Sequence, residues 1–110
     1  MDFTDALEQF RNYICYYFNK RGLVWPNFDD AMKFLLTEVA ETYELDLARD
    51  TWLRNNPDSK PEFDKERLSE ELGDVIMMAI VAGIAEDVNP LLSLYNKTQK
   101  KLKALEVKNV

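Results

Sequence analysis

Histidine is absent from this sequence of 110 residues, and cysteine occurs only once. Without histidine, imidazole acid–base catalysis, a Ser-His-Asp triad and the usual His-ligated catalytic zinc sites are all excluded. The ferritin-like di-iron arrangement, which needs Glu-x-x-His on two helices, is excluded for the same reason. The single Cys15 cannot form an intramolecular disulfide, and we expect it to be a small buried apolar residue. Any metal bound by this chain therefore has oxygen ligands.

Glycine, basic charge and long apolar runs are also scarce. There are only 3 glycines, and the alternation typical of strands is missing. The net charge of −6 disfavours nucleic acid as a partner. The longest apolar run, Val75 to Ala85, is shorter than the roughly 20 residues that span a bilayer, and we expect no signal peptide before the first helix. We expect one domain, residues 1–110, in a soluble cytoplasmic protein with no membrane partner.

Apolar residues recur with helical spacing along most of the chain. Gly22 is placed to end the first helix, and Asn89 followed by Pro90 is typical of a helix start. The segment 54–64, with two prolines and no periodicity, is predicted to be a loop. The expected helices cover residues 4–20, about 27–53, 65–86 and 89 onward. These elements predict an all-α protein, an antiparallel bundle of about four helices.

The second and third predicted helices carry more apolar surface than one bundle can cover. The run Val75 to Ala85 has no polar residue. The main apolar face of the second helix consists of Met32, Leu36, Val39, Tyr43 and Leu47. An additional apolar arc on the opposite side consists of Phe34, Leu45 and Trp52. We expect a homodimer, or a dimer of dimers, paired along these helices. The alternative is that the first helix and the 54–64 loop cover the surface within one chain.

Two pairs of acidic residues lie beside these apolar segments. Glu38 and Glu41 are three residues apart, and so are Glu71 and Asp74. Carboxylates that share a half-buried seam repel one another, and raised pKa values, salt bridges or bound cations can relieve the repulsion. Pairs with this spacing on two neighbouring helices converge on one point, which favours cations. Mg²⁺ or Mn²⁺ fits oxygen ligands best.

The motifs "TEVAE" and "EELGD" contain these pairs. In this order they resemble the E-x-x-E and E-x-x-D motifs of the MazG-like all-α NTP pyrophosphatase superfamily, over roughly Trp25 to Lys101. The resemblance implies a Mg²⁺-dependent enzyme that cleaves a nucleoside triphosphate between its α and β phosphates. Such hydrolases release the monophosphate and pyrophosphate, as in house-cleaning of nucleotide pools.

The resemblance also implies roles for individual residues. The four acidic residues would be metal ligands, and the carboxylate that activates the water is left open. Lys97 and Lys101 would bind phosphate, although both also fit ordinary surface lysines. Trp25 would pack on the base, or would be a core tryptophan. Two competing functions are a phosphoribosyl-ATP pyrophosphatase and a non-catalytic helical interaction module.

Overall fold

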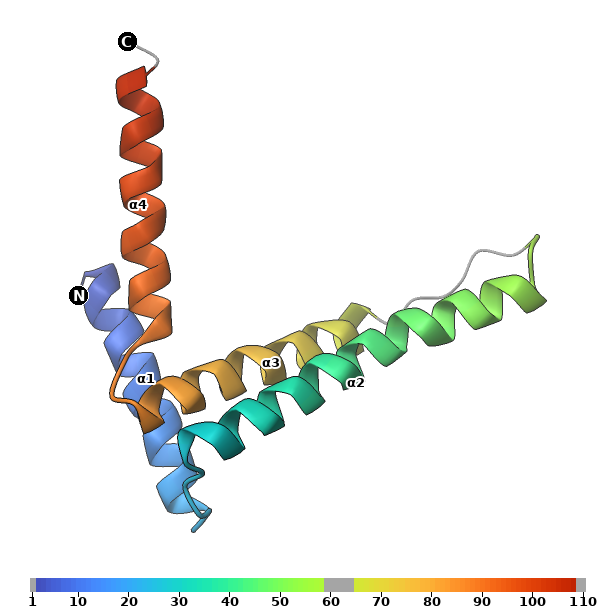
Figure 1. The fold of residues 1–110 in the computed structure, drawn as a ribbon, viewed down its shortest axis with the longest axis horizontal. Coiled ribbons are helices and arrows are strands. Elements are labelled where there is room, and N and C mark those ends of the chain that lie inside the picture. Colours follow the sequence, from blue (N-terminus) through green and yellow to red (C-terminus); the bar gives the residue numbers. More distant parts are fainter. Residues whose placement is uncertain (1, 59–64, 109–110) are drawn as a thin grey trace.

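The computed structural model describes residues 2–58 and 65–108, which form four α-helices and no strand (Figure 1). They are α1 (Phe3–Lys20), α2 (Phe28–Asn55), α3 (Lys65–Ala85) and α4 (Pro90–Lys108). The all-helical prediction is confirmed, and the compared helix ends fall within two residues of those predicted. Residues 59–64 of the predicted loop lie outside the described residues.

The helix ends follow from local sequence signals. Asn27 caps α2, because its side-chain oxygen accepts a hydrogen bond from the backbone N–H of Asp30 at 2.8 Å. Asn89 caps α4 in the same way by accepting from Leu92 N–H at 3.2 Å. Gly22 follows the end of α1 with a φ of 66°, which glycine adopts without strain. These polar side chains and this glycine satisfy the backbone groups that a helix leaves unpaired at its ends.

A tight turn joins α3 to α4. The backbone N–H of Val88 donates to the carbonyl of Gly83 at 2.8 Å, and Asp87 has a φ of 54°. A Cβ atom at Gly83 would lie 2.8 Å from Pro90 Cδ and 2.9 Å from the Val88 carbonyl oxygen. Only glycine therefore fits at this position with the turn as it stands. The two helices meet at 102°.

The helices form an open, angular molecule with two arms (Figure 1). α2 and α3 lie antiparallel along one arm, α1 crosses their shared end, and α4 projects as the other arm. The radius of gyration is 18.5 Å, whereas a compact chain of this length has about 13 Å. The expected four-helix bundle is therefore not closed within one chain: only α2 and α3 pair extensively. The physical reason is the sharp α3–α4 turn, which prevents α4 from folding back along α3.

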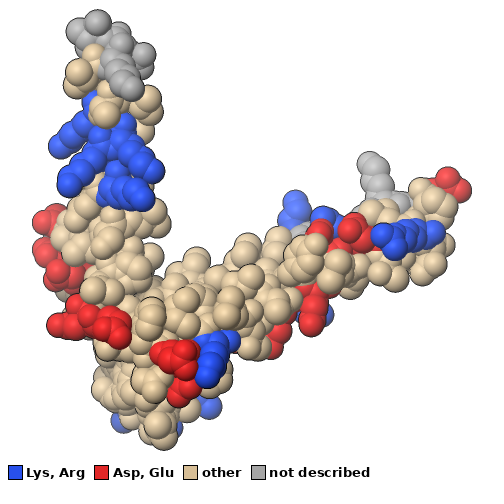
Figure 2. Space-filling view, viewed as in Figure 1, with Lys and Arg blue, Asp and Glu red and all other residues tan. Residues whose placement is uncertain are grey.

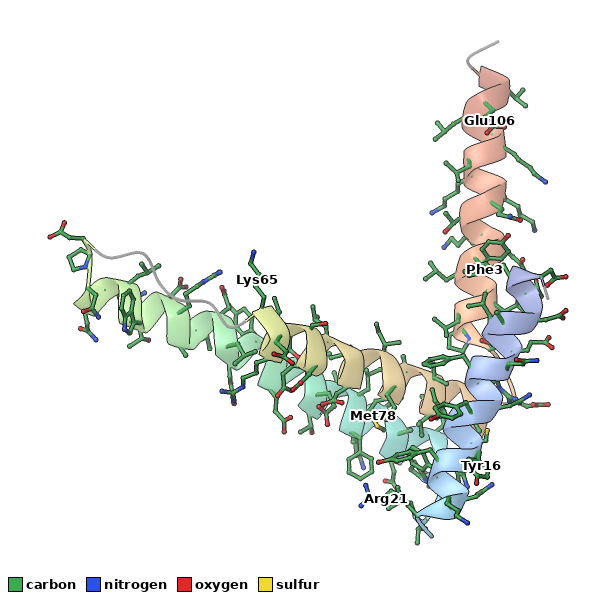
Figure 3. The ribbon with its side chains drawn as sticks, turned by 180° about the vertical axis from the view of Figure 1, so that it is seen from behind. Phe3, Tyr16, Arg21, Lys65, Met78 and Glu106 are labelled. Atoms are coloured by element: carbon green, nitrogen blue, oxygen red, sulfur yellow. The ribbon has the colours of Figure 1, made fainter. Side chains whose placement is uncertain are left out.

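The core lies where α1 meets the start of α2 and the end of α3 (Figure 3). Its buried hydrophobic residues are Ile14, Phe18, Ala31, Ile80, Val81 and Ala82. Burial of the apolar run in α3 thus occurs mainly in its last turns. Within the described residues, no single helix has the length and apolar content to cross a bilayer. Among the described helices, only α3 and α4 taken together, across their bend, have the required length and apolar content.

The orientation of α2 differs from the one that its apolar pattern indicates. Leu35, Glu38 and Leu45 are partly buried, and the contacts of α2 are with α3. Val39 and Tyr43, in the arc predicted as the main apolar face, are exposed. The packed stripe therefore lies between the two predicted arcs, because Phe34 and Trp52 of the additional arc are exposed too. Most of the main apolar arc faces outward.

Candidate metal centre

Three of the four predicted acidic residues meet between α2 and α3. Glu38 comes from α2, whereas Glu71 and Asp74 come from α3, and one carboxylate oxygen of each lies within 4.8 Å of the others. Glu38 and Glu71 are partly buried and Asp74 is exposed. The antiparallel pairing brings the middle of α2 opposite the first half of α3, as the two motifs predict. The three carboxyl groups form the acidic cluster.

Two oxygen atoms of the acidic cluster are buried and have no hydrogen-bond partner within residues 2–58 and 65–108. They are Oε2 of Glu38 and Oε2 of Glu71. An unpaired buried carboxylate oxygen is costly, because the charge loses its hydration without gaining a donor. Either a proton or a cation would satisfy these atoms. Carboxylate oxygens that converge in this way are the ligands that Mg²⁺ and Mn²⁺ prefer.

The electrostatics of the acidic cluster are repulsive. Partial burial raises the pKa of Glu38, and the negative charges of Glu41, Asp74 and Glu71 raise this pKa further. A hydrogen bond from the protonated carboxyl of Glu38 to Glu41 acts in the same direction. Every one of these influences favours the uncharged form of Glu38. A bound cation would have the opposite effect, since it favours the carboxylate.

Glu41, the fourth predicted ligand, lies beside the acidic cluster rather than in it. It is exposed on α2, one turn beyond Glu38, and interacts with Glu38. It is not among the residues whose oxygens meet within 4.8 Å. Glu41 therefore sits on the solvent side of the cluster.

The predicted phosphate-binding lysines lie on the other arm. Lys97 and Lys101 are exposed on α4. Figure 2 shows a group of basic residues along this helix. The acidic cluster lies on the α2–α3 arm, and α4 leaves α3 at 102°. Within one chain, the structure does not bring these lysines to the acidic cluster.

Trp25 packs in the core. Its ring stacks on that of Phe18 with the centroids 4.7 Å apart. The indole N–H donates to the side-chain oxygen of Asn19 at 2.8 Å. Both the apolar ring and the polar N–H are thus occupied by neighbours in the chain. This placement is the one that the alternative of a core tryptophan predicts.

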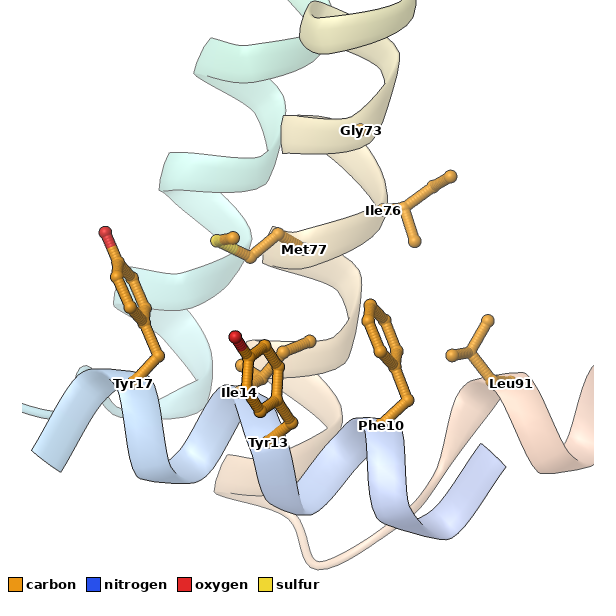
Figure 4. Close-up of a pocket in the computed structure, with 8 residues that line it drawn as sticks. All are labelled: Phe10, Tyr13, Ile14, Tyr17, Gly73, Ile76, Met77 and Leu91. Carbon is orange, nitrogen blue, oxygen red and sulfur yellow. The ribbon is translucent and has the colours of Figure 1, made fainter. Parts of the chain in front are cut away.

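The sequence pattern did not reveal an apolar pocket of about 420 Å³ between α1, α3 and α4 (Figure 4). Its lining residues are Phe10, Tyr13, Ile14, Tyr17, Gly73, Ile76, Met77 and Leu91. The available signal was the surplus of aromatic residues in α1. Tyr13 and Tyr17 lie beside the buried stripe of Ile14 and Phe18, and both remain exposed.

Comparisons with models of protein families, with curated proteins and with solved structures find no match to this chain. The likeness to the MazG-like superfamily therefore stays a prediction from two short motifs. The placement of Glu38, Glu71 and Asp74 is an independent observation, because it comes from the packing of α2 on α3.

Proposed function

We propose that this protein is a Mg²⁺-dependent nucleoside triphosphate pyrophosphohydrolase. It cleaves a ribo- or deoxyribonucleoside triphosphate between the α and β phosphates, and its products are the monophosphate and pyrophosphate. The observation that carries this proposal is the pair of buried, unpartnered oxygens on Glu38 and Glu71 beside Asp74. They belong to the two motifs that resemble the MazG-like superfamily. Nucleotide-pool cleaning in the cytoplasm, where Mg²⁺ and nucleotides are plentiful, is the corresponding role.

The acidic residues divide into two groups by position, because the carboxylate oxygens of three of them meet and Glu41 lies beside them. Glu38, Glu71 and Asp74 would hold the ion, with Mn²⁺ able to replace Mg²⁺. When bound, the ion neutralises charge on the phosphate oxygens and polarises the anhydride. Glu41, exposed at the solvent side, is suited to orient the attacking water and accept its proton.

Repulsion between the acidic cluster and the triphosphate makes hydrolysis depend on a bound cation. The acidic cluster and the triphosphate are both negative, and the protein as a whole carries −6. Without a cation, the four carboxylates repel the substrate at the distance where hydrolysis must occur. The lysines of α4 do not offset this charge within one chain. Activity should therefore vanish on chelation and return on addition of Mg²⁺.

Phosphorus NMR of the reaction tests the proposal. The protein is incubated with each canonical nucleoside triphosphate and deoxynucleoside triphosphate, with Mg²⁺ or with chelator. The expected products are monophosphate and pyrophosphate, in the Mg²⁺ samples alone. A nucleoside diphosphate with orthophosphate would contradict the cleavage position. Turnover of phosphoribosyl-ATP but of no free triphosphate would favour the alternative pyrophosphatase.

A non-catalytic interaction module is the second candidate, favoured by the exposed apolar residues on α2 and α4. It predicts no turnover of any nucleotide and no effect of Mg²⁺ on stability. The same NMR samples and a melting curve with Mg²⁺ therefore separate the two functions.

A further inference from the structure

The apolar pocket beside α1 continues along α3 as an open groove. The groove has a volume of about 590 Å³, and one stripe of α3 lines it, which consists of Lys65, Leu68, Ser69, Leu72, Gly73 and Ile76. Gly73 and Ile76 also line the pocket, so the two spaces meet at these residues. Because the lining residues of the groove are spaced as neighbours on one side of a helix, the groove follows a single side of α3. We call the pocket and the groove together the apolar channel.

The pocket forms the enclosed end of the apolar channel. The rings of Phe10, Tyr13 and Tyr17 extend from α1 toward α3, and Leu91 of α4 lies beside them (Figure 4). None of the described residues that line the pocket is charged, and among them only Tyr13 and Tyr17 carry hydroxyl groups. A polar ligand would lose its hydration there and gain few partners in return. The enclosed end therefore suits hydrocarbon.

Gly73 keeps the middle of the apolar channel open. A Cβ atom at this position would meet no other atom of the described residues within 4 Å. The neighbouring side chains of Leu72 and Ile76 are 46% and 51% exposed. The backbone does not require glycine here, since Gly73 lies inside α3 and its φ is not positive. A larger side chain at Gly73 would occupy the channel without straining the helix.

A cation lies at the open end of the apolar channel. Lys65, the first residue of α3, lines the groove there and is exposed. From Lys65 to Met77 in the pocket, α3 rises about 18 Å at about 1.5 Å per residue. The hydrocarbon core of a bilayer is about 30 Å thick, so one acyl chain of a membrane lipid reaches about 15 Å. The channel thus has the length of one such chain, with a positive charge where a head group would emerge.

We propose that the apolar channel binds one long-chain fatty acid. The acyl chain lies along α3 with its end in the pocket beside α1, and its carboxylate pairs with the ammonium group of Lys65. A fatty acid is the occupant that fits, because the channel is about one acyl chain long, follows one row of residues and ends at a cation. Each CH₂ group that enters the channel leaves water, and this transfer is favourable.

The acidic cluster lies on another side of α3. Asp74 is two residues from both Leu72 and Ile76, which corresponds to about 200° around the helix. A fatty acid in the apolar channel therefore leaves the acidic cluster accessible. This binding does not depend on the proposed hydrolase activity.

Calorimetric titration of the full chain with hexadecanoate tests the proposal, with chelator present and below the concentration at which the acid aggregates. One molecule should bind per chain. Octanoate should bind more weakly, because it buries about half as much hydrocarbon. If hexadecanoate does not bind, or if octanoate binds equally well, the proposal is overturned.

Gly73→Leu tests whether the acid occupies the apolar channel. Leucine is a better helix former than glycine, so the variant should fold, and circular dichroism checks its helix content. Its affinity for hexadecanoate should fall about tenfold or more, because the added side chain fills the space that the acyl chain needs. The matched control is Gly73→Ala, which also favours the helix but adds only one methyl group and should bind more tightly than Gly73→Leu. Wild-type affinity in Gly73→Leu would show that the acid binds elsewhere and would overturn the proposal.

Lys65→Met tests the position of the carboxylate. Affinity for hexadecanoate should fall about two- to fivefold, as expected for the loss of one exposed ion pair. The control is Arg21→Met, which removes the same charge at the opposite end of the channel, where the Arg21 guanidinium donates to the Tyr17 hydroxyl at 2.8 Å. This control should bind like wild type. A loss of affinity in Arg21→Met but not in Lys65→Met would overturn the assigned position of the carboxylate.

A second copy of the chain is the competing occupant, because the exposed side chains of Leu72 and Ile76 could also pack against another protein surface. Light scattering coupled to size exclusion measures the mass of the same samples. A mass of two or more 12.9 kDa chains together with no bound hexadecanoate would assign the channel to a second copy and overturn the proposal.

Discussion

Replacement of Glu38 by Gln should stabilise the metal-free protein. The carboxylate oxygens of Glu38, Glu71 and Asp74 lie within 4.8 Å of one another. Two unit charges at this distance repel by about 0.9 kcal/mol in a water-like dielectric and by about 3.5 kcal/mol at an effective dielectric of 20. Because Asp74 is exposed, the lower value governs its pair with Glu38. We expect the free energy of unfolding to rise by about 1 kcal/mol, which corresponds to about 4 °C in melting temperature.

Circular dichroism measures this difference in thermal and urea unfolding, with chelator present and at one protein concentration. The matched control is Glu44→Gln, which neutralises an exposed carboxylate of α2 outside the acidic cluster. Its free energy of unfolding should change by no more than about 0.5 kcal/mol. Saturating Mg²⁺ should then make wild type more stable than Glu38→Gln, because a ligand stabilises only the protein that binds it. Wild type should gain stability, and Glu38→Gln should gain much less.

Two results would refute this reasoning. If Glu38→Gln destabilises the chelated protein, the repulsion within the acidic cluster does not govern its stability. If Mg²⁺ leaves the melting temperature of wild type unchanged, the unpartnered oxygens of Glu38 and Glu71 are not cation ligands.

Three further predictions address pH, hydrolysis and phosphate binding. The pKa of Glu38 is raised above 4.5 in the folded state, so the stability of metal-free wild type relative to Glu38→Gln should rise as pH falls through the raised pKa and level off below 4.5. A pH series of urea melts measures this, and a relative stability that falls on acidification would contradict the raised pKa. Glu71→Gln should lower Mg²⁺-dependent hydrolysis by orders of magnitude, whereas Glu70→Gln, an exposed neighbour outside the acidic cluster, should retain activity. Because Lys97 and the acidic cluster lie on different arms of one chain, Lys97→Ala and Lys103→Ala should give similar KM values for the triphosphate, and a rise in Lys97→Ala alone would show that Lys97 of another chain reaches the substrate.

The helices could be predicted from the sequence because their signals are local. Gly22 and the caps at Asn27 and Asn89 lie within a few residues of the backbone groups that they satisfy. The spacing of apolar residues then defines the segment between two such ends. None of these signals depends on how the helices are arranged in space.

The acidic cluster could be predicted in part. The spacing in the two motifs places Glu38 near Glu41 and Glu71 near Asp74 on their own helices. Whether Glu41 reaches α3 depends on the rotation of α2 about its axis, which packing decides. The pattern of α2 marks two apolar arcs and does not say which one packs inside the chain. The structure packs the stripe between them, which contains Leu35, Glu38 and Leu45.

The direction of α4 could not be predicted, since it depends on contacts across a turn. The sequence shows a helix that starts at Pro90 and carries an apolar stripe, which fits a bundle. The open arm results from the approach of Pro90 and Val88 to Gly83, which only the three-dimensional structure shows. Leu102 and Leu105 consequently remain exposed.

The angle at the Gly83 turn also determines where the residues of α4 lie. A helix rises about 1.5 Å per residue, so Lys97 lies about 10 Å along α4 from Pro90, and Val107 lies about 26 Å along it. A 10° change at the turn would displace Lys97 by about 2 Å and Val107 by about 4 Å. A methyl group at Gly83 would force the turn to shift, because it would lie 2.8 Å from Pro90 Cδ. The position of the lysines on α4 therefore depends on the absence of a Cβ atom at Gly83.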